Sequence, residues 1–249
     1  MNSSQLKWVA IAAMAIDHLG MLLRALPFMA AAPGSQADGV LTALRLIGRL
    51  AFPIFALLIV EGCAHTRSLK RYFLRLSLFA ALSQIPYQLF ENLCLGQAPF
   101  SVFAGSNVLV TFALSVGAVS CFKSARSGRR FLCALGVFGC LAGTLLLSGA
   151  YDLCGFLLIF VGSWLRGREG APPRLWGKAI EPALPALAIV GLYYALILSA
   201  PLGQTIAAML GCALFLLYNG RPGSRRLKNF FYIFYPAHLL LLSAVFLLV

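Results

Sequence analysis

Long stretches without a charged residue follow one another along almost the whole chain, and they limit what it can fold into. The segments 131–148, 183–199 and 204–218, for example, contain no Asp, Glu, Lys or Arg. Only 11% of the 249 residues are charged and 61% are hydrophobic, whereas soluble domains carry about 25% charged residues. A soluble fold of this size cannot bury so much apolar surface. We therefore expect an integral membrane protein without a separate soluble catalytic domain.

The uncharged stretches predict an all-α, polytopic transmembrane helix bundle of about nine spans, formed by residues 1–249 as one domain. A spanning helix needs about 20 residues, and turn sequences such as 32–35 and 219–223 separate the stretches. The predicted helices are 6–27, 40–62, 72–90, 106–122, 131–148, 151–165, 183–199, 204–218 and 229–249.

The basic residues predict the orientation of this bundle. Seventeen of the twenty Lys and Arg residues precede the first stretch or lie in every second connection: Lys7, Arg67, Lys70, Arg71, Arg75, Lys123, Arg126, Arg129, Arg130, Arg166, Arg168, Arg174, Lys178, Arg221, Arg225, Arg226 and Lys228. The alternate connections contain neither Lys nor Arg. Because basic loops stay in the cytoplasm, we expect a cytoplasmic N-terminus and a C-terminus outside. A net charge of +13 would suggest a nucleic-acid partner in a soluble protein, but in a membrane protein it is first a topology signal. We therefore expect the lipid bilayer as partner and no nucleic acid.

The three remaining cations, Arg24, Arg45 and Arg49, lie inside predicted spans. A charge at this depth costs at least about 2.5–3.5 kcal/mol on insertion scales, so each arginine needs a partner, water or a function. Arg45 and Arg49 are four residues apart and share one face of a helix. We expect Asp17, in the first span, to pair with one of them across the helix interface.

Depth along the helices brings three further side chains to one level. At about 1.5 Å per residue, His18, Arg49 and His238 reach the middle of the bilayer from three different helices. Pro53 and Pro236 each remove a backbone N–H near this level, so both helices should kink there and leave room for water or a ligand. We expect one polar cluster within the membrane.

Structural roles are the alternative for each of these residues. The aspartate and the arginines could form an ion pair that only fixes packing, with the histidines as hydrogen-bonded core residues. Glu61 and His65 lie at the inner edge of a span, where interfacial anchoring is the alternative to function. Asp152 and Asn107 are candidate caps of helix starts on the outer side.

The seven cysteines are scattered and never form a C-x-x-C pair. This pattern argues against a disulfide framework and against a zinc site, so we expect no metal. Most of the cysteines lie in apolar stretches, where a thiol behaves as a small hydrophobic side chain.

Several motifs, taken together and in order, resemble the TraX family. They include Asp17-His18-Leu19-Gly20 and Tyr235-Pro236-Ala237-His238. The full set lies at 7–8, 15–20, 45–55, 61–67, 82–87, 218–221 and 231–238, and so extends over nearly the whole chain. The resemblance implies N-terminal acetylation of a conjugative pilin, with acetyl-CoA as donor, in the bacterial inner membrane.

The motifs are also distantly similar to transmembrane acyltransferases of the acyltransferase-3 type, which place a functional histidine on an early helix and arginines on another. This similarity implies that His18 is the catalytic histidine and that Arg45 and Arg49 are the arginine pair. His238 resembles a histidine near the end of the last helix of such enzymes.

A neutral imidazole suits the required chemistry, because acyl transfer needs a base near pH 7. His18 would activate the acceptor directly or carry the acetyl group as an acyl-imidazole. Arg49, together with Arg45, could stabilise the developing oxyanion, and Asp17 would hold an arginine in place.

The predicted cytoplasmic ends of the helices carry candidate ligands for the phosphates of the coenzyme. They are Arg225, Arg226 and Lys228, with His65 as a fourth candidate. The alternative is that these cations only set the topology.

The function expected from the residues and the resemblance is a membrane-embedded acetyltransferase. It would move an acetyl group from cytoplasmic acetyl-CoA to an amine or hydroxyl of a pilin-like peptide or a small molecule. A proton-coupled transporter or channel is the alternative, because it also places Asp, His and Arg in its spans. A non-catalytic assembly factor is a third possibility.

Overall fold

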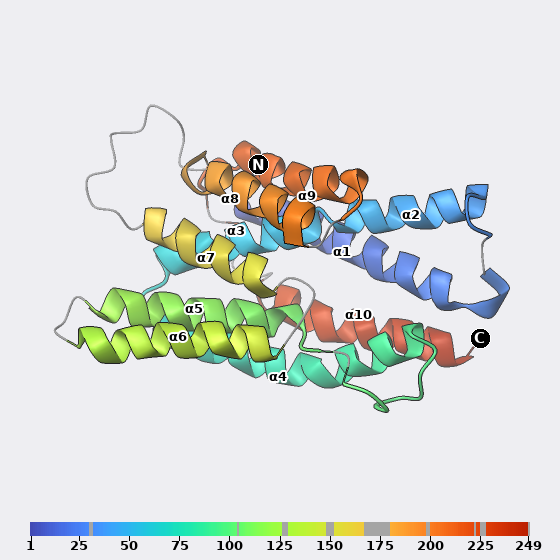
Figure 1. The fold of residues 1–249 in the computed structure, drawn as a ribbon, viewed down its shortest axis with the longest axis horizontal. Helices are drawn as coiled ribbons and strands as arrows, with labels where there is room; N and C mark the ends of the chain where they lie inside the picture. Colours follow the sequence, from blue (N-terminus) through green and yellow to red (C-terminus); the bar gives the residue numbers. More distant parts are fainter. Residues whose placement is uncertain are drawn as a thin grey trace.

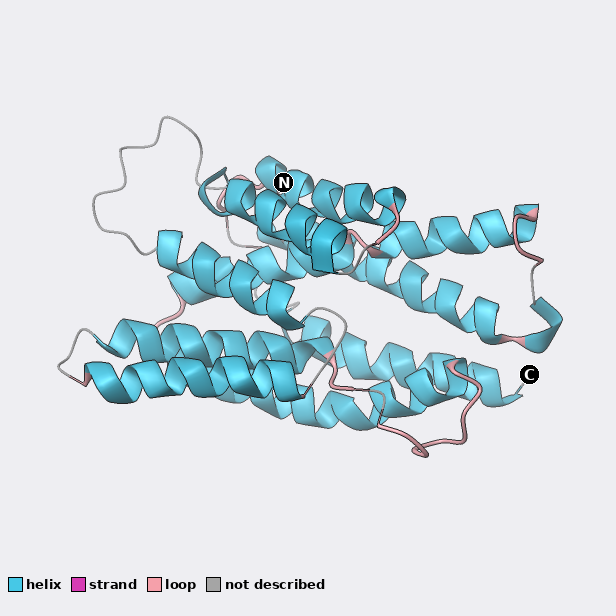
Figure 2. Cartoon of the chain, viewed as in Figure 1, coloured by secondary structure: helices cyan, strands magenta, loops and turns pink. Residues whose placement is uncertain are grey.

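The computed structural model of the chain describes residues 1–29, 32–103, 105–125, 129–147, 152–166, 180–197, 200–221, 223–224 and 228–248. Within these residues it consists of helices joined by loops, without a β-strand (Figure 2). The α-helices are α1 (Ser3–Ala25), α2 (Gln36–Gly48), α3 (Ala51–His65), α4 (Leu69–Cys94), α5 (Val108–Ser124), α6 (Arg130–Leu146), α7 (Asp152–Arg166), α8 (Ile180–Leu192), α9 (Leu202–Leu214) and α10 (Lys228–Leu248). Short 3₁₀ segments η1 (Pro27–Met29) and η4 (Phe215–Leu217) and a π-helical segment η3 (Tyr193–Ile197) complete them. The all-α prediction is confirmed for these residues.

The second predicted stretch, 40–62, differs from the expectation of one kinked helix. The chain breaks at Arg49 and Leu50, whose backbone N–H groups donate to carbonyls three residues earlier at 3.1 and 3.2 Å. Pro53 is the third residue of α3, where a backbone N–H has no helical partner to lose. The proline therefore begins a new helix instead of bending a continuous one. In contrast, α10 continues through Pro236 as one helix.

Several helices have the length and composition of membrane spans. Three segments are long and apolar enough to cross a bilayer: Ser3–Ala25, Gln36–His65 and Phe230–Leu248. Shorter apolar helices of 10–17 residues occupy most of the other predicted stretches. These helices support a membrane protein, while the number of spans and the orientation stay predictions.

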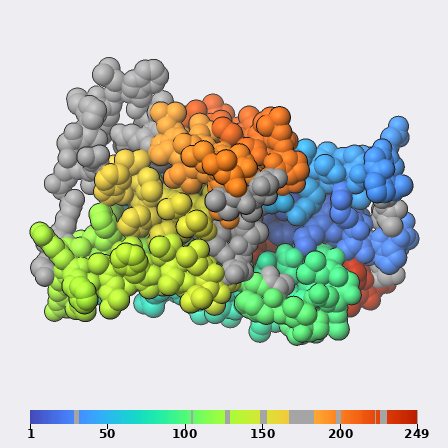
Figure 3. Space-filling model, in the orientation of Figure 1, coloured from blue at the N-terminus to red at the C-terminus, as the bar shows by residue number. Residues whose placement is uncertain are grey.

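Figure 1 shows how the helices are arranged. Helices α4, α5, α6 and α10 lie along one side, α8 and α9 lie on the other, and α7 lies between them. Helix α7 packs against α3, α5 and α8, while α1 packs against α2, α3 and α10. In Figure 3 the hairpin of α1 and α2 forms the blue end of the molecule. The first and last long helices therefore meet, although they are far apart in sequence.

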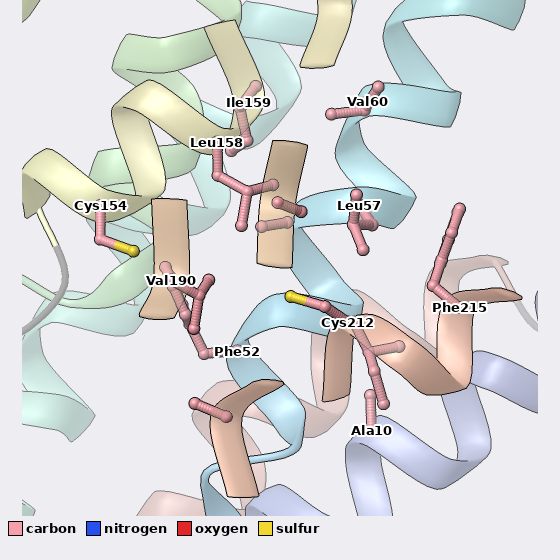
Figure 4. Packing of buried hydrophobic residues seen from close by; sticks show 14 of the residues in the cluster. Ala10, Phe52, Leu57, Val60, Cys154, Leu158, Ile159, Val190, Cys212 and Phe215 are labelled. Carbon is pink, nitrogen blue, oxygen red and sulfur yellow. The ribbon is translucent and has the colours of Figure 1, made fainter. Parts of the chain in front are cut away.

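The apolar core lies among α1, α3, α7, α8 and α9. Figure 4 shows side chains of this core packed against one another. The labelled residues are Ala10, Phe52, Leu57, Val60, Cys154, Leu158, Ile159, Val190, Cys212 and Phe215. Small residues allow the close approach that van der Waals packing requires between helices in lipid. A side chain added at Gly211 of α9 would lie 2.7 Å from the Leu50 carbonyl oxygen. Helix α9 thus packs directly on the break between α2 and α3.

The 218–221 motif anchors the start of α1. The backbone N–H of Asn219 donates to the Met1 carbonyl at 2.9 Å, and that of Ser3 donates to the Arg221 carbonyl at 3.2 Å. Asn2 and Gln5 add a capping box at the same helix start. These bonds fix the position of the helix that carries Asp17 and His18.

The 82–87 motif has a similar structural role at the start of α5. The Gln84 side chain donates to the Gly105 carbonyl at 2.9 Å and accepts from the Asn107 amide at 2.7 Å. Asn107 in turn accepts from the backbone N–H of Leu109 at 3.1 Å, which confirms it as the N-cap of α5. The side chain of Asp152, the other expected cap, lies outside the described residues.

Candidate functional site

An ion pair joins α1 to α2 at the centre of the candidate site. Nη1 of Arg45 lies 2.9 Å from Oδ1 of Asp17, and the two side chains are 29% and 19% exposed. Gly48, one turn further along α2, makes this approach possible, because an added Cβ would lie 2.2 Å from the Cβ of Asp17. The expected cross-helix pair therefore forms, with Arg45 as the partner in contact.

Arg24, another cation expected inside a span, also has an acidic partner. Arg24, near the end of α1, donates to Asp38 of α2 at 2.9 Å and to Thr42 at 3.1 Å. This pair lies toward the tip of the α1–α2 hairpin, where Arg24 and Asp38 are partly exposed. It holds the hairpin together away from the histidines.

His18 of α1 and His238 of α10 are in direct contact. Nε2 of His238 lies 3.0 Å from Nδ1 of His18, and the ring centroids are 5.0 Å apart. Nδ1 of His238 lies 2.8 Å from the carbonyl oxygen of Phe234, whose ring also stacks on the imidazole at 4.8 Å. The expectation that these two histidines come together is confirmed, while their depth in the membrane stays a prediction.

This chain of contacts fixes the tautomers of both histidines when they are neutral. The carbonyl of Phe234 can only accept, so Nδ1 of His238 carries the proton and donates to it. Nε2 of His238 then has the lone pair and accepts from Nδ1–H of His18. Nε2 of His18 is consequently unprotonated. A nitrogen in this state can take up a proton or attack an electrophilic carbon.

Arg49 lies at the break after α2 and acts on different neighbours from Arg45. Its charge interacts with Asp17 and with Tyr194, which is completely buried in the π-helical segment that follows α8. Single π-helical turns inside helices occur frequently at functional sites. Tyr194 was not among the residues expected from the sequence. The sequence feature that could have indicated Tyr194 is its hydroxyl group within an otherwise apolar predicted span.

Glu91 of α4 is a further residue that the sequence did not bring to attention. Its charge interacts with those of Arg45 and Asp17. The preceding residue, Phe90, is fully buried and packs edge-on against the His18 ring, with centroids 5.5 Å apart. We call Asp17, His18, Arg45, Arg49, Glu91 and His238 the polar cluster.

A second group of charges lies at the other end of α3. Oε1 of Glu61 lies 2.6 Å from Nη2 of Arg166 on α7, and both side chains are largely buried. His65 contacts the Glu61 carboxylate at 3.4 Å and its carbonyl at 2.9 Å, with 61% of the His65 side chain exposed. Glu61 therefore joins α3 to α7. These residues lie away from the polar cluster.

The expected coenzyme ligands are only partly described. Arg225 and Arg226 lie outside the described residues, and Lys228 begins α10 with its side chain outside them. Two other cations pack on aromatic rings near the first turns of α10. Arg75 lies 5.5 Å from the ring of Tyr232, and Lys7 lies 5.2 Å from that of Phe231.

No group of three or more His, Cys, Asp or Glu side chains within the described ranges could hold a metal ion. The cysteines in these ranges are all free thiols. The side chains of the polar cluster can transfer protons, attack through an imidazole nitrogen and stabilise negative charge through arginine.

Comparisons with known proteins complete the description of the site. The family model described as "TraX protein" matches residues 2–246 of the chain. A "Probable fimbrial assembly protein FimC, serogroup H1" from Dichelobacter nodosus is 28% identical over 264 residues, which cover 98% of this chain and 95% of that protein. No solved structure matches the chain.

Proposed function

This chain belongs to the TraX family, and we propose that it is a membrane-embedded acetyltransferase. It would transfer an acetyl group from cytoplasmic acetyl-CoA to an acceptor amine or hydroxyl. The contact between His18 and His238 carries the proposal, because it leaves Nε2 of His18 unprotonated and oriented by a second residue. A catalytic base held by a third group is the arrangement that acyl transfer uses on many folds.

Two routes are open to His18. In direct transfer, Nε2 takes the proton of the acceptor while the acceptor attacks the thioester carbonyl. The C–S bond then breaks, and His18 gives the proton to the departing thiolate. In covalent transfer, Nε2 itself attacks the carbonyl, the C–S bond breaks and the thiolate leaves, so that His18 carries the acetyl group. The acceptor then attacks the acetyl carbon, the C–N bond to His18 breaks, and the proton of the acceptor goes to the thiolate. His238 assists both routes, because its Nε2 accepts a hydrogen bond from Nδ1–H of His18 and so stabilises the positive charge that develops on the His18 ring.

The arginines and Tyr194 supply the electrostatic part of the proposal. Each tetrahedral intermediate places a negative charge on the former carbonyl oxygen, and hydrogen-bond donors near this oxygen lower its free energy. Arg49 and Tyr194 lie within electrostatic range of one another and of Asp17. We assign them to this oxyanion, while Asp17 holds Arg45 in position.

Cations at the inner ends of the helices are the candidates for the phosphates of acetyl-CoA. Arg75 and Lys7 sit on aromatic rings of α10, the helix that also carries His238. Together with Arg225, Arg226 and Lys228 they would attract a polyanionic donor from the cytoplasm.

The proposed acceptor is a pilin-like peptide. The relative from Dichelobacter nodosus is named as a probable fimbrial assembly protein, and it aligns over almost its full length. A protein that modifies a pilin subunit at the bacterial inner membrane would also take part in fimbrial assembly. A small molecule stays the alternative acceptor.

Turnover by the purified protein tests the proposal. In detergent, the wild-type protein should release free thiol from acetyl-CoA when an acceptor is present, and His18→Ala should abolish the release without loss of folded protein. His65→Ala is the control, because His65 makes the same bond to the carbonyl four residues earlier but contacts no second histidine among the described residues. Equal turnover by the wild-type and His18→Ala proteins would remove His18 from the mechanism.

The same assay separates the other classes of function. A proton-coupled transporter would need a sealed vesicle to show activity and would not release thiol in detergent. An assembly factor without catalysis would bind no acetyl-CoA, so isothermal titration with acetyl-CoA distinguishes it from an enzyme that lacks its acceptor.

A further inference from the structure

A cavity of about 340 Å³ lies between α4 and α5, two helices that pack against each other (Figure 1). Its residues on α4 lie about one turn apart and so share one face of the helix: Phe73, Ser77, Ala80, Ala81 and Gln84. The small side chains of Ser77, Ala80 and Ala81 leave space between the two helices. The cavity shares no residue with the polar cluster, so it has no part in the mechanism proposed above.

The cavity opens toward the apolar outer surface of the helices. Phe103 and Leu147 belong to its lining and are 63% and 43% exposed, and none of the described residues that line it is charged. The neighbouring face of α4 carries a row of exposed apolar side chains, which are Leu74, Leu78, Leu82 and Ile85. In a membrane protein such a surface faces the acyl chains of the bilayer and not water.

The polar groups at one end of the cavity are already bonded within the protein. The Gln84 side chain donates to the Gly105 carbonyl at 2.9 Å and accepts from the Asn107 amide at 2.7 Å. The backbone N–H of Ser106 donates to the Leu147 carbonyl at 3.1 Å. A buried water needs about two to four polar partners, whereas an apolar cavity of about 150 Å³ takes an apolar molecule such as benzene. The cavity therefore suits an apolar ligand.

The dimensions of the cavity select one kind of apolar ligand. From Phe73 to Gln84 the lining follows α4 for about 16 Å, at a rise of about 1.5 Å per residue. This length is about half of the hydrocarbon core of a bilayer, or one leaflet. The volume divided by this length gives a mean cross-section of about 20 Å², whereas an α-helix about 10 Å across needs about 80 Å². The cavity is thus long enough for an acyl chain and too narrow for a helix of a partner protein.

We propose that this cavity binds one acyl chain of a membrane phospholipid. The ester end of the chain lies beside Gln84 and Ser106, the polar lining residues near the start of α5, and the methyl end lies toward Phe73. The chain fills the space that the small residues leave and makes the van der Waals contacts that join helices in lipid. Because it binds the folded protein, it stabilises that state.

Photolabelling in a bilayer tests the proposal. The protein is reconstituted in vesicles of phosphatidylethanolamine and phosphatidylglycerol that contain a phospholipid with a diazirine in its acyl chain, and mass spectrometry identifies the labelled residues. A chain in the cavity should label Ala113, a lining residue on α5 that is only 4% exposed. Lipid at the outer surface reaches Leu74 and Leu78 but not Ala113.

A variant that fills the cavity makes this test specific. Ala81→Phe should lower the labelling of Ala113 at least about tenfold, because the added ring takes the place of the chain, and should leave that of Leu74 unchanged. Ala142→Phe is the matched control, since Ala142 is exposed on α6 and does not line the cavity. Wild-type labelling confined to the exposed row of α4 would overturn the proposal, and so would equal labelling of Ala113 in the wild-type and Ala81→Phe proteins.

Thermal unfolding in detergent gives a second measurement. Dipalmitoyl phosphatidylglycerol should raise the Tm of the wild-type and Ala142→Phe proteins by more than that of Ala81→Phe. The lipid with the same headgroup and hexanoyl chains should raise none of them. Equal shifts in all three proteins, or equal shifts with both chain lengths, would contradict a chain-binding cavity. If Ala81→Phe does not fold, Ala81→Leu replaces it, with a smaller expected loss of labelling.

Discussion

Replacement of His238 tests the hydrogen bond that sets the tautomer of His18. His238→Phe keeps an aromatic ring beside Phe234 but removes the imidazole acceptor for Nδ1–H of His18. His238→Gln places an amide oxygen that can still accept from that N–H. The two variants therefore differ in whether an acceptor for this N–H is present.

The expected magnitudes follow from the energies of these bonds. A neutral hydrogen bond contributes about 0.5–1.5 kcal/mol. Its loss therefore raises the population of the inactive tautomer of His18, relative to the active one, by up to about tenfold. The bond becomes charge-assisted when His18 is protonated during transfer, and is then worth about 1.5–3 kcal/mol, or about 10–100-fold in rate. We expect His238→Phe to lower kcat by about 100-fold, and His238→Gln to lower it by less than about tenfold.

The assay is the release of free thiol from acetyl-CoA, together with thermal unfolding and ¹⁵N spectra of histidine-labelled protein. In the spectra the wild-type His18 should show a protonated Nδ1 and an unprotonated Nε2, and His238→Phe should show a mixture of tautomers. His65→Phe is the matched control at the inner end of α3. Equal loss of activity in His238→Gln and His238→Phe, at equal folded yield, would refute the role of the hydrogen bond.

Two further predictions concern the scaffold. Gly48→Ala should displace α1 from α2, because the added carbon would lie 2.2 Å from Asp17, and should lower stability by about 1–3 kcal/mol with a larger loss of activity, whereas Gly39→Ala on the same helix meets open space and should be tolerated in both measurements. For the orientation, a single cysteine at Gln97 should react with an impermeant thiol reagent added outside intact cells and one at Arg67 should not, in a background without native cysteine. The opposite labelling would reverse the predicted topology.

Much of the fold could be predicted because a lipid environment permits few backbone conformations. Backbone groups in a bilayer must be satisfied within each segment, so uncharged stretches of sufficient length become helices. The same regularity made the contact between His18 and His238 predictable, since depth increases by a constant rise per residue on uninterrupted helices. Pro53 predicted a distortion near Arg49, and the chain does change direction there. That the distortion separates two helices, with α9 packed on Leu50, is a tertiary arrangement that the local sequence did not indicate.

The missed site residues have a common physical cause. Glu91 lies near the end of its helix, where a carboxylate is commonly solvated, and only the approach of α1 brings it to Asp17. Tyr194 lies in an apolar stretch, and the π-helical turn that directs it cannot be recognised from composition. The sequence also did not pair Glu61 with Arg166, which was counted only as a topology signal and lies 2.6 Å from it. In each case the neighbour that completes the contact comes from a distant segment of the chain.

The break at Arg49 also changes how the two arginines should be understood. Their spacing of four residues predicted one shared face and therefore one shared role. In the structure Arg45 belongs to α2 and contacts Asp17, while Arg49 follows the last residue of the helix and its charge interacts with Tyr194 of the segment after α8. The two arginines therefore have different neighbours, although their spacing suggested the same ones. This difference is the reason to assign Arg45 to the support of Asp17 and Arg49 to the oxyanion in the proposed mechanism.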